Sequence, residues 1–522
     1  MNLILTPMKT YLTESFPWQL QTHSYLPYTN FTSWNTATLE LYQAIEAELP
    51  EYSNVYHDSN FGMVIIRHRV KCMHNILLPG IPGAVFYGAT MRSVLSHISG
   101  FNETDMFKLK NWHNKGACLL IELFGFSFGE QCLWITASDE KANINYACTI
   151  YQRLGLGWFT FAFRTAVTIY ISYLLWYKYY KHIYSLEQHL RQYGHHRCIS
   201  NDKISYELII GDPTAPLLMN KWISWALFLD IWFGLGEIFI AIILSSQTDD
   251  IPTLLTSFMY LTRLVWNAYM IICFTNLFLK RFAMEHNFIP LDPTYIAIFV
   301  GIYSPIFAWV GGNIECVMNV LHYLVECMVP IESKTHCVDV ALVIIFYLVC
   351  IGALPILYGR FIPQWNAKKV APLNAKFASS FRYNNFKNRV FLALTGTSHY
   401  KKESNVCSLG GTIYTFLVAN PRYMRFPTLC CRAADCFLLC INDKLLSEKI
   451  RISLLKLLDT SLKTNESSIE EATFSTPFIV HQLHIKPKKL TSKVQPRSKR
   501  KKSKQNNNVV IVKSTLPTAW CI

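Results

Sequence analysis

The chain has 522 residues, a formal net charge of +15 and a positive mean hydropathy of +0.19. Only 16% of its residues are charged, against about 25% in an ordinary soluble protein. Together with apolar runs of twenty residues or more, this excludes an ordinary soluble protein and predicts a multi-pass membrane protein. Ten Lys and Arg residues and no acid lie between Lys486 and Lys504, so the basic charge belongs mainly to the tail. We therefore do not expect nucleic acid as a partner.

Residues 1–153 precede the first long apolar run and are predicted to form a mixed α+β domain. The segment MVIIRHRV (63–70) alternates loosely and predicts a strand, and GIPGAVFYG (80–88) predicts a turn followed by a strand. Residues 117–136 are apolar, but Glu122 and Glu130 interrupt them. We interpret them as the core of this domain, with a sixth membrane span as the alternative.

Two glycosylation triplets and four cysteines lie in the same region. Asn30-Phe-Thr and Asn102-Glu-Thr match the acceptor pattern, which predicts a glycoprotein if both asparagines are outside or lumenal. Cysteines 72, 118, 132 and 148 would form two disulfides in an oxidising compartment, and four buried thiols are the alternative. No two cysteines have the CxxC spacing, so we expect no metal site.

Five segments are long and apolar enough to cross a ~30 Å hydrocarbon core, which takes about 20 helical residues. They predict an all-α membrane bundle over 154–359. The expected spans are 154–177, 222–245, 254–279, 294–312 and 338–359.

The loop charges predict how the bundle is oriented, because cytoplasmic loops are enriched in Lys and Arg. The connections 178–221 and 280–293 and the segment after 359 are basic, whereas 246–253 has no basic residue and 313–337 has only Lys334. We expect the N-terminus outside or lumenal and the C-terminus cytoplasmic, in the plasma membrane or an endomembrane. About 150 residues would then be translocated without a visible signal. Either the first span carries them across or an upstream span is missing from the gene model, and we favour the second explanation.

Four charged residues lie well inside the predicted spans. Arg164, Glu237 and Arg263 are 10, 8 and 9 residues from the expected outer boundary, or ~12–15 Å at the helical rise, and Asp230 lies deeper. A central charge is costly in lipid, so it usually faces a partner or water. We predict a network of Arg164, Asp230, Glu237, Arg263 and Asn267, with Glu237 paired to Arg263. A polar pathway for an ion or solute is the alternative to a structural role.

The region after the spans divides into residues 360–485 and a disordered basic tail, 486–522. Leucines and an isoleucine at helical spacing predict an amphipathic helix over 443–462. The tail is expected to bind anionic lipid electrostatically, so the predicted partners are the bilayer and anionic lipid. Its lipid-binding candidates are Lys486, Lys488, Lys489, Arg497, Lys499, Arg500, Lys501 and Lys502.

The central part of the chain carries one resemblance. IIGDPTAPLL (209–218), LDIW, SQTDD and YLTRLVWNAY, all between Ile209 and Phe274, resemble an uncharacterised multi-pass transmembrane protein family of oomycetes. The resemblance covers about residues 150–360. It implies a domain before a bundle and a cytoplasmic tail after it, and it implies no activity.

The sequence contains no HExxH, GxSxG, Walker A or GxGxxG pattern. We therefore expect no enzyme, no catalytic residue and no cofactor. The favoured hypothesis is a membrane receptor, scaffold or adaptor with an outer domain and a basic tail. The alternative is a transporter or channel subunit that uses the intramembrane charges.

Overall fold

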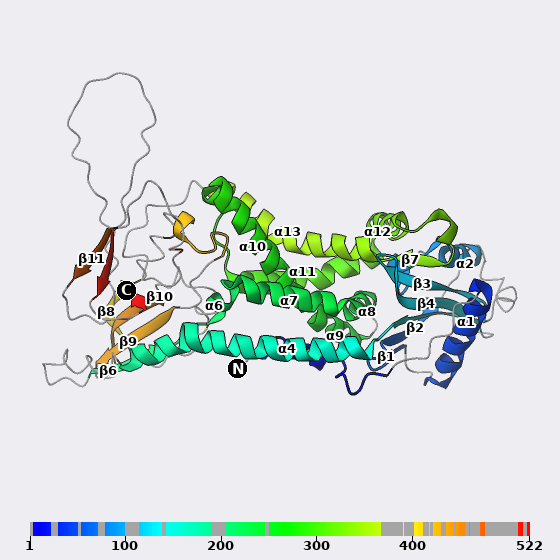
Figure 1. The fold of residues 1–522 in the computed structure, drawn as a ribbon, viewed down its shortest axis with the longest axis horizontal. Coiled ribbons are helices and arrows are strands. Elements are labelled where there is room, and N and C mark those ends of the chain that lie inside the picture. The colour runs from blue at the N-terminus through cyan, green and yellow to red at the C-terminus, as the bar shows by residue number, and fades with distance from the viewer. Residues whose placement is uncertain are drawn as a thin grey trace, which may run out of the picture. The chain divides into compact units, whose positions relative to one another are not determined.

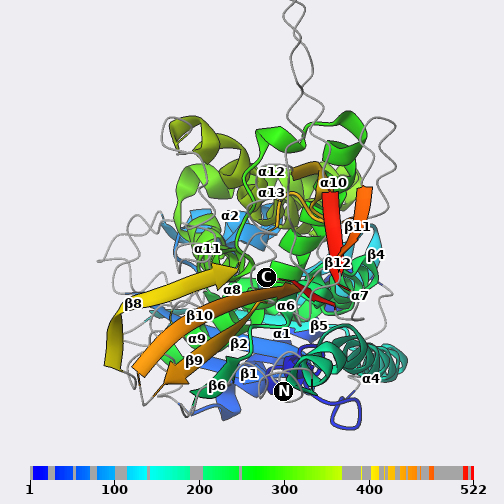
Figure 2. The same cartoon turned by 90° about the vertical axis from the view of Figure 1, so that its left-hand side faces the viewer.

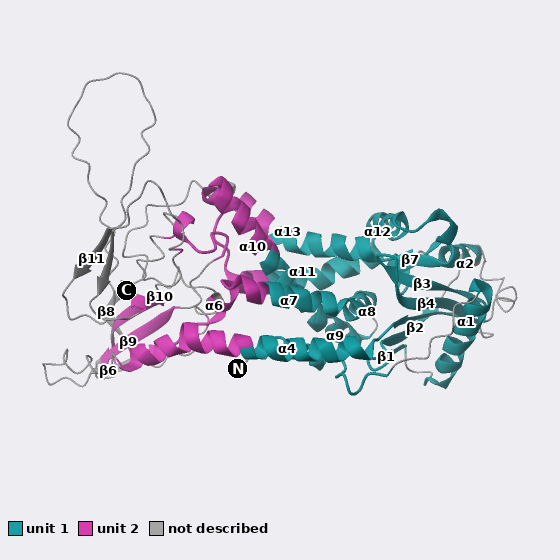
Figure 3. Ribbon diagram, viewed as in Figure 1, with its two compact units in different colours: residues 1–169, 225–270, 297–354 teal, residues 170–224, 271–296, 355–522 magenta. Residues whose placement is uncertain are grey.

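The computed structural model describes residues 4–21, 30–50, 54–70, 79–99, 114–137, 142–188, 204–245, 250–366, 390, 401–410, 417, 421–429, 435–442, 445–454, 459, 470–474, 510–514 and 519–521. The chain forms two compact units (Figure 3). Unit 1 comprises residues 1–169, 225–270 and 297–354, and unit 2 comprises residues 170–224, 271–296 and 355–522.

The N-terminal part of unit 1 is an α+β region built on a six-stranded sheet of order β1-β2-β5-β4-β3-β7 (Figure 1). The strand predicted over 63–70 is confirmed as β2. The apolar stretch 117–136 is confirmed as sheet core, because it forms the antiparallel pair β3–β4. The strands are β1 (Val55–Asp58), β2 (Met63–Val70), β3 (Gly116–Leu123), β4 (Phe126–Ala137), β5 (Ala142–Ile150) and β7 (Cys337–Asp339).

Helix α1 (Phe31–Glu48) covers one face of this sheet (Figure 1). Its buried Trp34 and Tyr42 pack in one apolar cluster with Ile65, Trp134 and other sheet residues. A disulfide joins Cys118 to Cys132, which are directly opposite each other on β3 and β4. Of the four cysteines expected to form two disulfides, Cys148 is a buried free thiol and Cys72 lies outside the described residues.

The other face is covered in part by η2 (Ala84–Phe86), a short 3-10 helix, and α2 (Ala89–Ser99). The strand predicted within 80–88 is therefore wrong. Gly83 has φ +70°, and a Cβ there would lie 2.5 Å from the ring of Tyr146, so the chain turns against the sheet and does not extend it. The Gln131 amide then donates to the Phe86 carbonyl at 2.7 Å.

Within the described residues, four helical stretches are long and apolar enough to cross a membrane: Leu154–Gln188, Ile251–Phe282, Pro293–Asn313 and Ala341–Phe361. They contain α4 (Leu154–Leu175), the π-helical turn η4 (Trp176–Tyr180), α9 (Ile251–Leu261), η5 (Thr262–Leu264), α10 (Val265–Phe282), α11 (Pro293–Asn313) and most of α13 (Ala341–Asn366). Large apolar side chains on them are exposed, for example Ile169 at 66% and Ile302 at 58%. Exposure of this kind over whole helices is typical of lipid-facing surfaces.

The segment predicted as the second span is a broken pair. Helix α7 (Lys221–Phe233) and helix α8 (Leu235–Ser245) meet at Gly234 with a bend of 68°. Residues 238–245 of α8 are all buried. Phe239 packs on Phe86 and on Phe128 of β4, with ring centroids 4.3 and 6.3 Å apart. Helix α8 is therefore covered by protein rather than by lipid. Irregular backbone at membrane depth is tolerated where protein covers it in this way.

The predicted fifth span, 338–359, begins as strand and not as helix. Its first two residues belong to β7, which pairs in parallel with β3, and α13 starts at Ala341. Helix α12 (Glu315–Cys327) stands between α11 and β7, and the imidazole of its buried His322 lies 2.6 Å from the carbonyl of Ala84. The connection 313–337 thus packs with the N-terminal α+β region.

Unit 2 contains a five-stranded sheet of order β13-β10-β9-β6, with β8 paired to β10 (Figure 2). Its strands are β6 (Ile204–Ile209), β8 (Lys401–Gly410), β9 (Cys436–Asn442), β10 (Leu445–Leu454) and β13 (Trp520–Cys521). A separate parallel pair joins β11 (Glu470–Phe474) to β12 (Val510–Ser514). Strand β6 comes from the loop 178–221, so that loop and the C-terminal region share one fold.

The amphipathic helix predicted over 443–462 is wrong, because residues 445–454 form β10. Both faces of this strand are buried: Leu446 and Ile450 lie in the core, while Lys449 is 4% and Arg451 1% exposed. Arg451 forms a buried ion pair with Asp435, and Lys449 lies over the ring of Phe437. The leucine spacing fits a helix, but pairing with neighbouring strands on both edges makes residues 445–454 a strand.

Candidate intramembrane charge site

The segment before the α+β region, residues 4–21, lies against the first membrane helix. It contains η1 (Met8–Leu12) and an aromatic row in which Phe16 stacks on both Tyr11 and Trp18. Trp18 meets Phe161 of α4 edge to face, with centroids 5.6 Å apart. Ser15 donates a hydrogen bond to the Asn60 side chain at the β1–β2 turn. These contacts hold Glu14 at the helices.

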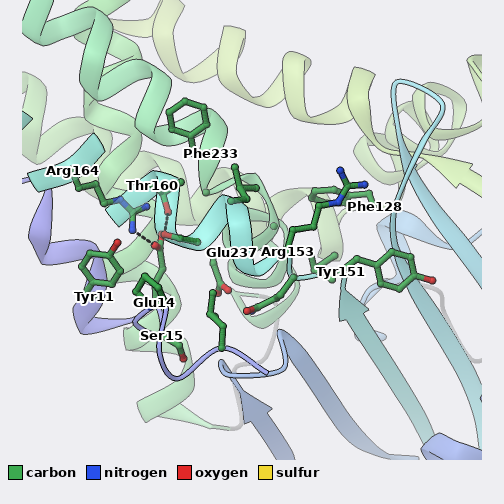
Figure 4. Close-up of a pocket in the computed structure, with 18 residues that line it drawn as sticks. Tyr11, Glu14, Ser15, Phe128, Tyr151, Arg153, Thr160, Arg164, Phe233 and Glu237 are labelled. Carbon is green, nitrogen blue, oxygen red and sulfur yellow. Dashed lines mark hydrogen bonds and ion pairs between the residues drawn. The ribbon is translucent and has the colours of Figure 1, made fainter. Parts of the chain in front are cut away.

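Two carboxylates and two guanidinium groups form a closed ring in unit 1. Arg164 donates from Nε to Asp230 at 2.6 Å. Arg164 also pairs with Glu14 (Figure 4). Arg263 donates from Nη1 to Glu14 and from Nη2 to Asp230, both at 2.6 Å. Tyr260 donates to Glu14 at 2.6 Å and accepts from Arg263. Each carboxylate thus bridges both arginines, and the four charges sum to zero.

The ring is buried. The side chains of Arg164 and Asp230 are 2% and 5% exposed, and those of Glu14 and Arg263 are 11% and 14%. Tyr11 also lies over the Arg164 guanidinium at 4.9 Å. Pairing and hydrogen bonding offset the desolvation cost of a buried charge, whereas removal of one partner leaves a lone buried charge.

The bend at Gly234 brings these side chains together. A Cβ on Gly234 would lie 2.7 Å from the Tyr260 hydroxyl, 3.2 Å from a Glu14 oxygen and 3.3 Å from an Arg263 nitrogen. The ring therefore packs directly on the backbone of the break. The segment WFGLGE (232–237) places Gly234 where the side chains of the ring lie against the backbone.

The structure brings together Arg164, Asp230 and Arg263 of the predicted network. The predicted pair of Glu237 and Arg263 differs from the structure, in which the oxygens around Arg263 come from Glu14, Asp230 and Tyr260. The physical reason is the bend, because Glu237 follows Gly234 in the first turn of α8 and no longer shares a helix face with Asp230.

Asn267 lies outside the ring. Its buried amide donates to the carbonyl of Leu348 at 2.6 Å and so joins α10 to α13. The i, i+4 spacing from Arg263 places both residues on one stretch of helix, but the two side chains have different partners.

Sequence reasoning missed Glu14. It lies 150 positions before Arg164 in a short polar and aromatic segment, and no pattern in that segment indicates that it enters the bundle. The charge count inside the spans gives no signal either, because two arginines balance Asp230 and Glu237.

Glu237 lines two cavities of about 140 and 160 Å³. The first is also lined by Tyr11, Glu14, Thr160 and Arg164 (Figure 4). The second lies between α8, the start of α9, Thr13 and His57 of β1. Each is large enough to hold several water molecules, and each has carboxylate and hydroxyl groups in a wall that is otherwise largely apolar.

The remaining predicted sites are placed only in part. Asn30 is exposed and caps α1 by accepting a hydrogen bond from the Thr32 amide. Asn102 and the basic residues Lys486, Lys488, Lys489, Arg497, Lys499, Arg500, Lys501 and Lys502 lie outside the described residues. No group of three or more His, Cys, Asp or Glu side chains with the arrangement of a metal site occurs in the part of the chain that the structure describes.

The chain matches no family model, no curated protein and no solved structure.

Proposed function

We propose that the protein is a multi-pass membrane receptor or signalling scaffold, whose outer α+β domain passes a conformational signal to the membrane helices. In this proposal the broken pair α7–α8 counts as one of five spans. The N-terminal domain is outside or lumenal, Asn30 and Asn102 are glycosylated, and the C-terminal region is cytoplasmic, with its basic tail at anionic lipid.

Asp339 carries the proposal, because one carboxylate joins the outer sheet to a membrane helix. Its Oδ1 accepts from the Ala341 amide at 2.8 Å, at the start of α13. Its Oδ2 accepts from the Gly125 amide at 2.9 Å, in the β3–β4 turn. Asp339 is 3% exposed. A displacement of this turn would therefore act on the end of α13.

Three further connections of the same kind support it. Strand β5 ends at Ile150 and α4 begins at Leu154, so only three residues separate sheet from helix. Phe239 of α8 packs under the sheet on Phe86 and Phe128. Glu14 reaches the charge ring from the segment attached to the β1–β2 turn. Short connections and packed contacts favour joint motion over independent motion.

An antibody fragment against the outer sheet tests the proposal. Its binding to the full chain in nanodiscs should change amide hydrogen exchange in α4 and α13. Asp339→Ala should weaken the change in α13. Asp250→Ala is the matched control, since Asp250 also precedes a helix but accepts from Thr253 within its own turn. Exchange in the helices that does not respond to the fragment would refute the receptor function.

A transporter or channel subunit is the second candidate, and the broken pair at Gly234 favours it. Discontinuous helices that place polar groups near the bilayer midplane are a recurring feature of transporter sites. The neutral, closed ring counts against a mobile gate of charges. Ion flux into proteoliposomes that Glu237→Gln abolishes would establish this candidate in place of the first.

A further inference from the structure

Glu237 is the one acid of the described site that the arginine ring does not neutralise. The two guanidinium groups are paired with Glu14 and Asp230, and this leaves Glu237 as the fifth charge. Arg153 lines the first cavity, but it is exposed and its guanidinium extends away from Glu237 (Figure 4). A carboxyl group without an ion pair, placed between two cavities, takes either a proton or a cation from solution.

The hydroxyl groups around the second cavity already donate hydrogen bonds to other protein groups. Ser257 donates to the Leu254 carbonyl at 2.7 Å, Thr256 to the Pro252 carbonyl at 2.9 Å, and Thr253 to Asp250 at 2.6 Å. Thr13 and Tyr260 are likewise committed, to the Thr10 carbonyl and to Glu14. Each hydroxyl has one proton and two lone pairs, so what these groups retain for a ligand is acceptor capacity.

Among the described residues that line this cavity, His57 is the one with a side-chain nitrogen, and it is exposed. The rest of the wall is hydroxyl, aliphatic or the Glu237 carboxylate. Such a wall disfavours an anion and favours a hard cation, which prefers oxygen ligands. One unpaired carboxylate matches a single positive charge, and the described residues form no cluster of acids or histidines suited to a divalent metal.

We propose that the cavity between α8, α9 and β1 binds a small monovalent cation, with Glu237 as its charged ligand and hydroxyl oxygens and water completing its shell. The site lies where the outer domain meets the broken helix pair. It does not depend on the receptor function, because either a receptor or a transporter would use it.

Thermal unfolding of the purified full chain in detergent tests the proposal at alkaline pH and constant ionic strength. Sodium, potassium and ammonium chlorides are compared with choline chloride, whose cation is too bulky for the site. One of the small cations should raise the unfolding midpoint until the site is saturated. Comparison of the three salts distinguishes a metal ion from an ammonium ion. Radioactive sodium or rubidium binding supplies an independent affinity for a metal ion.

Glu237→Gln keeps the shape of the side chain and removes its charge, and it should weaken cation binding by about 10- to 100-fold. Ser257→Ala removes one acceptor and should weaken binding by about 2- to 10-fold. Glu315→Gln, at an exposed glutamate on α12, is the matched control and should bind as the wild type does. The same midpoint in choline and in every small cation would overturn the proposal, as would unchanged affinity in Ser257→Ala and Glu237→Gln. If Glu237→Gln does not fold, Ser257→Ala alone decides.

Discussion

Glu14 and Arg164 form an ion pair although 150 positions separate them in the chain. Glu14 precedes the α+β region and Arg164 lies in the helix that follows it, so this contact joins the two ends of that region. It also completes the ring by giving each arginine a second carboxylate. The N-terminal segment is therefore part of the membrane bundle's charge balance.

We expect Glu14→Ala to destabilise the protein strongly, by ~3–5 kcal/mol, because both arginines would then share Asp230 alone. Trp18, four residues further on, stacks in the same segment, so its fluorescence should report release of that segment. Glu40→Ala, at an exposed position of α1, is the control and should lie within about 0.5 kcal/mol of wild type. Unchanged Trp18 emission in Glu14→Ala would argue against the ring.

Asp230 and Glu237 should differ sharply although both are acids within one predicted span. Asp230→Asn weakens both arginine contacts and should lower the thermal midpoint markedly, whereas Glu237→Gln, measured without small cations, should lower it little. In a double-mutant cycle, Asp230 and Arg263 should show coupling and Glu237 and Arg263 much less. Stronger coupling of Arg263 to Glu237 than to Asp230 would instead support the Glu237–Arg263 pair predicted from the sequence.

The basic tail remains a prediction of the sequence. A peptide of residues 486–504 should bind vesicles that contain phosphatidylserine and dissociate at high salt, because its ten basic residues are attracted by roughly 1 kcal/mol each near an anionic surface. A peptide of the same composition in scrambled order should bind equally. Binding to neutral vesicles with the same affinity would exclude an electrostatic mechanism.

The sequence predicted what depends on local hydropathy. The apolar helices, the strand at 63–70 and the sheet core at 117–136 are found where periodicity and length placed them. The sequence-based prediction failed where residues distant in the chain determine the conformation of a segment. Residues 445–454 have leucines at helical spacing, yet they pair with β8 and β9 on either side. The helix-face alignment of Asp230 and Glu237 assumed a straight span, and the bend at Gly234 removes it.

The cysteines of the six-stranded sheet give a prediction that tests its register. Peptide mapping without reduction should recover Cys118 linked to Cys132, with Cys148 as a free thiol. Burial raises the pKa of the Cys148 thiol, so it should resist alkylation until the domain unfolds. The exposed Cys316 and Cys327 of α12 should react in the native protein. A disulfide from Cys148 to either partner would require a different pairing of β3, β4 and β5.

Two glycines of the membrane helices provide a matched pair of substitutions. Gly234→Ala would place a methyl group 2.7 Å from the Tyr260 hydroxyl and 3.2 Å from Glu14, within a ring whose members cannot move without breaking an ion pair. We expect a loss of ~1–3 kcal/mol. Gly155→Ala, in the first turn of α4, meets no atom within 4 Å and should leave stability unchanged or raise it by up to ~1 kcal/mol, because alanine favours helix.

Thermal unfolding of the two alanine variants in the same detergent separates a close approach of the ring from a general intolerance of helix substitution. If Gly234→Ala were as stable as Gly155→Ala, the ring could not be packed on the backbone of the break. Suppression of the Gly234→Ala defect by Tyr260→Phe would support the packing directly. That change removes the hydroxyl oxygen that the new methyl group meets first, although it also removes the hydrogen bond to Glu14. The double variant should therefore recover only part of the loss.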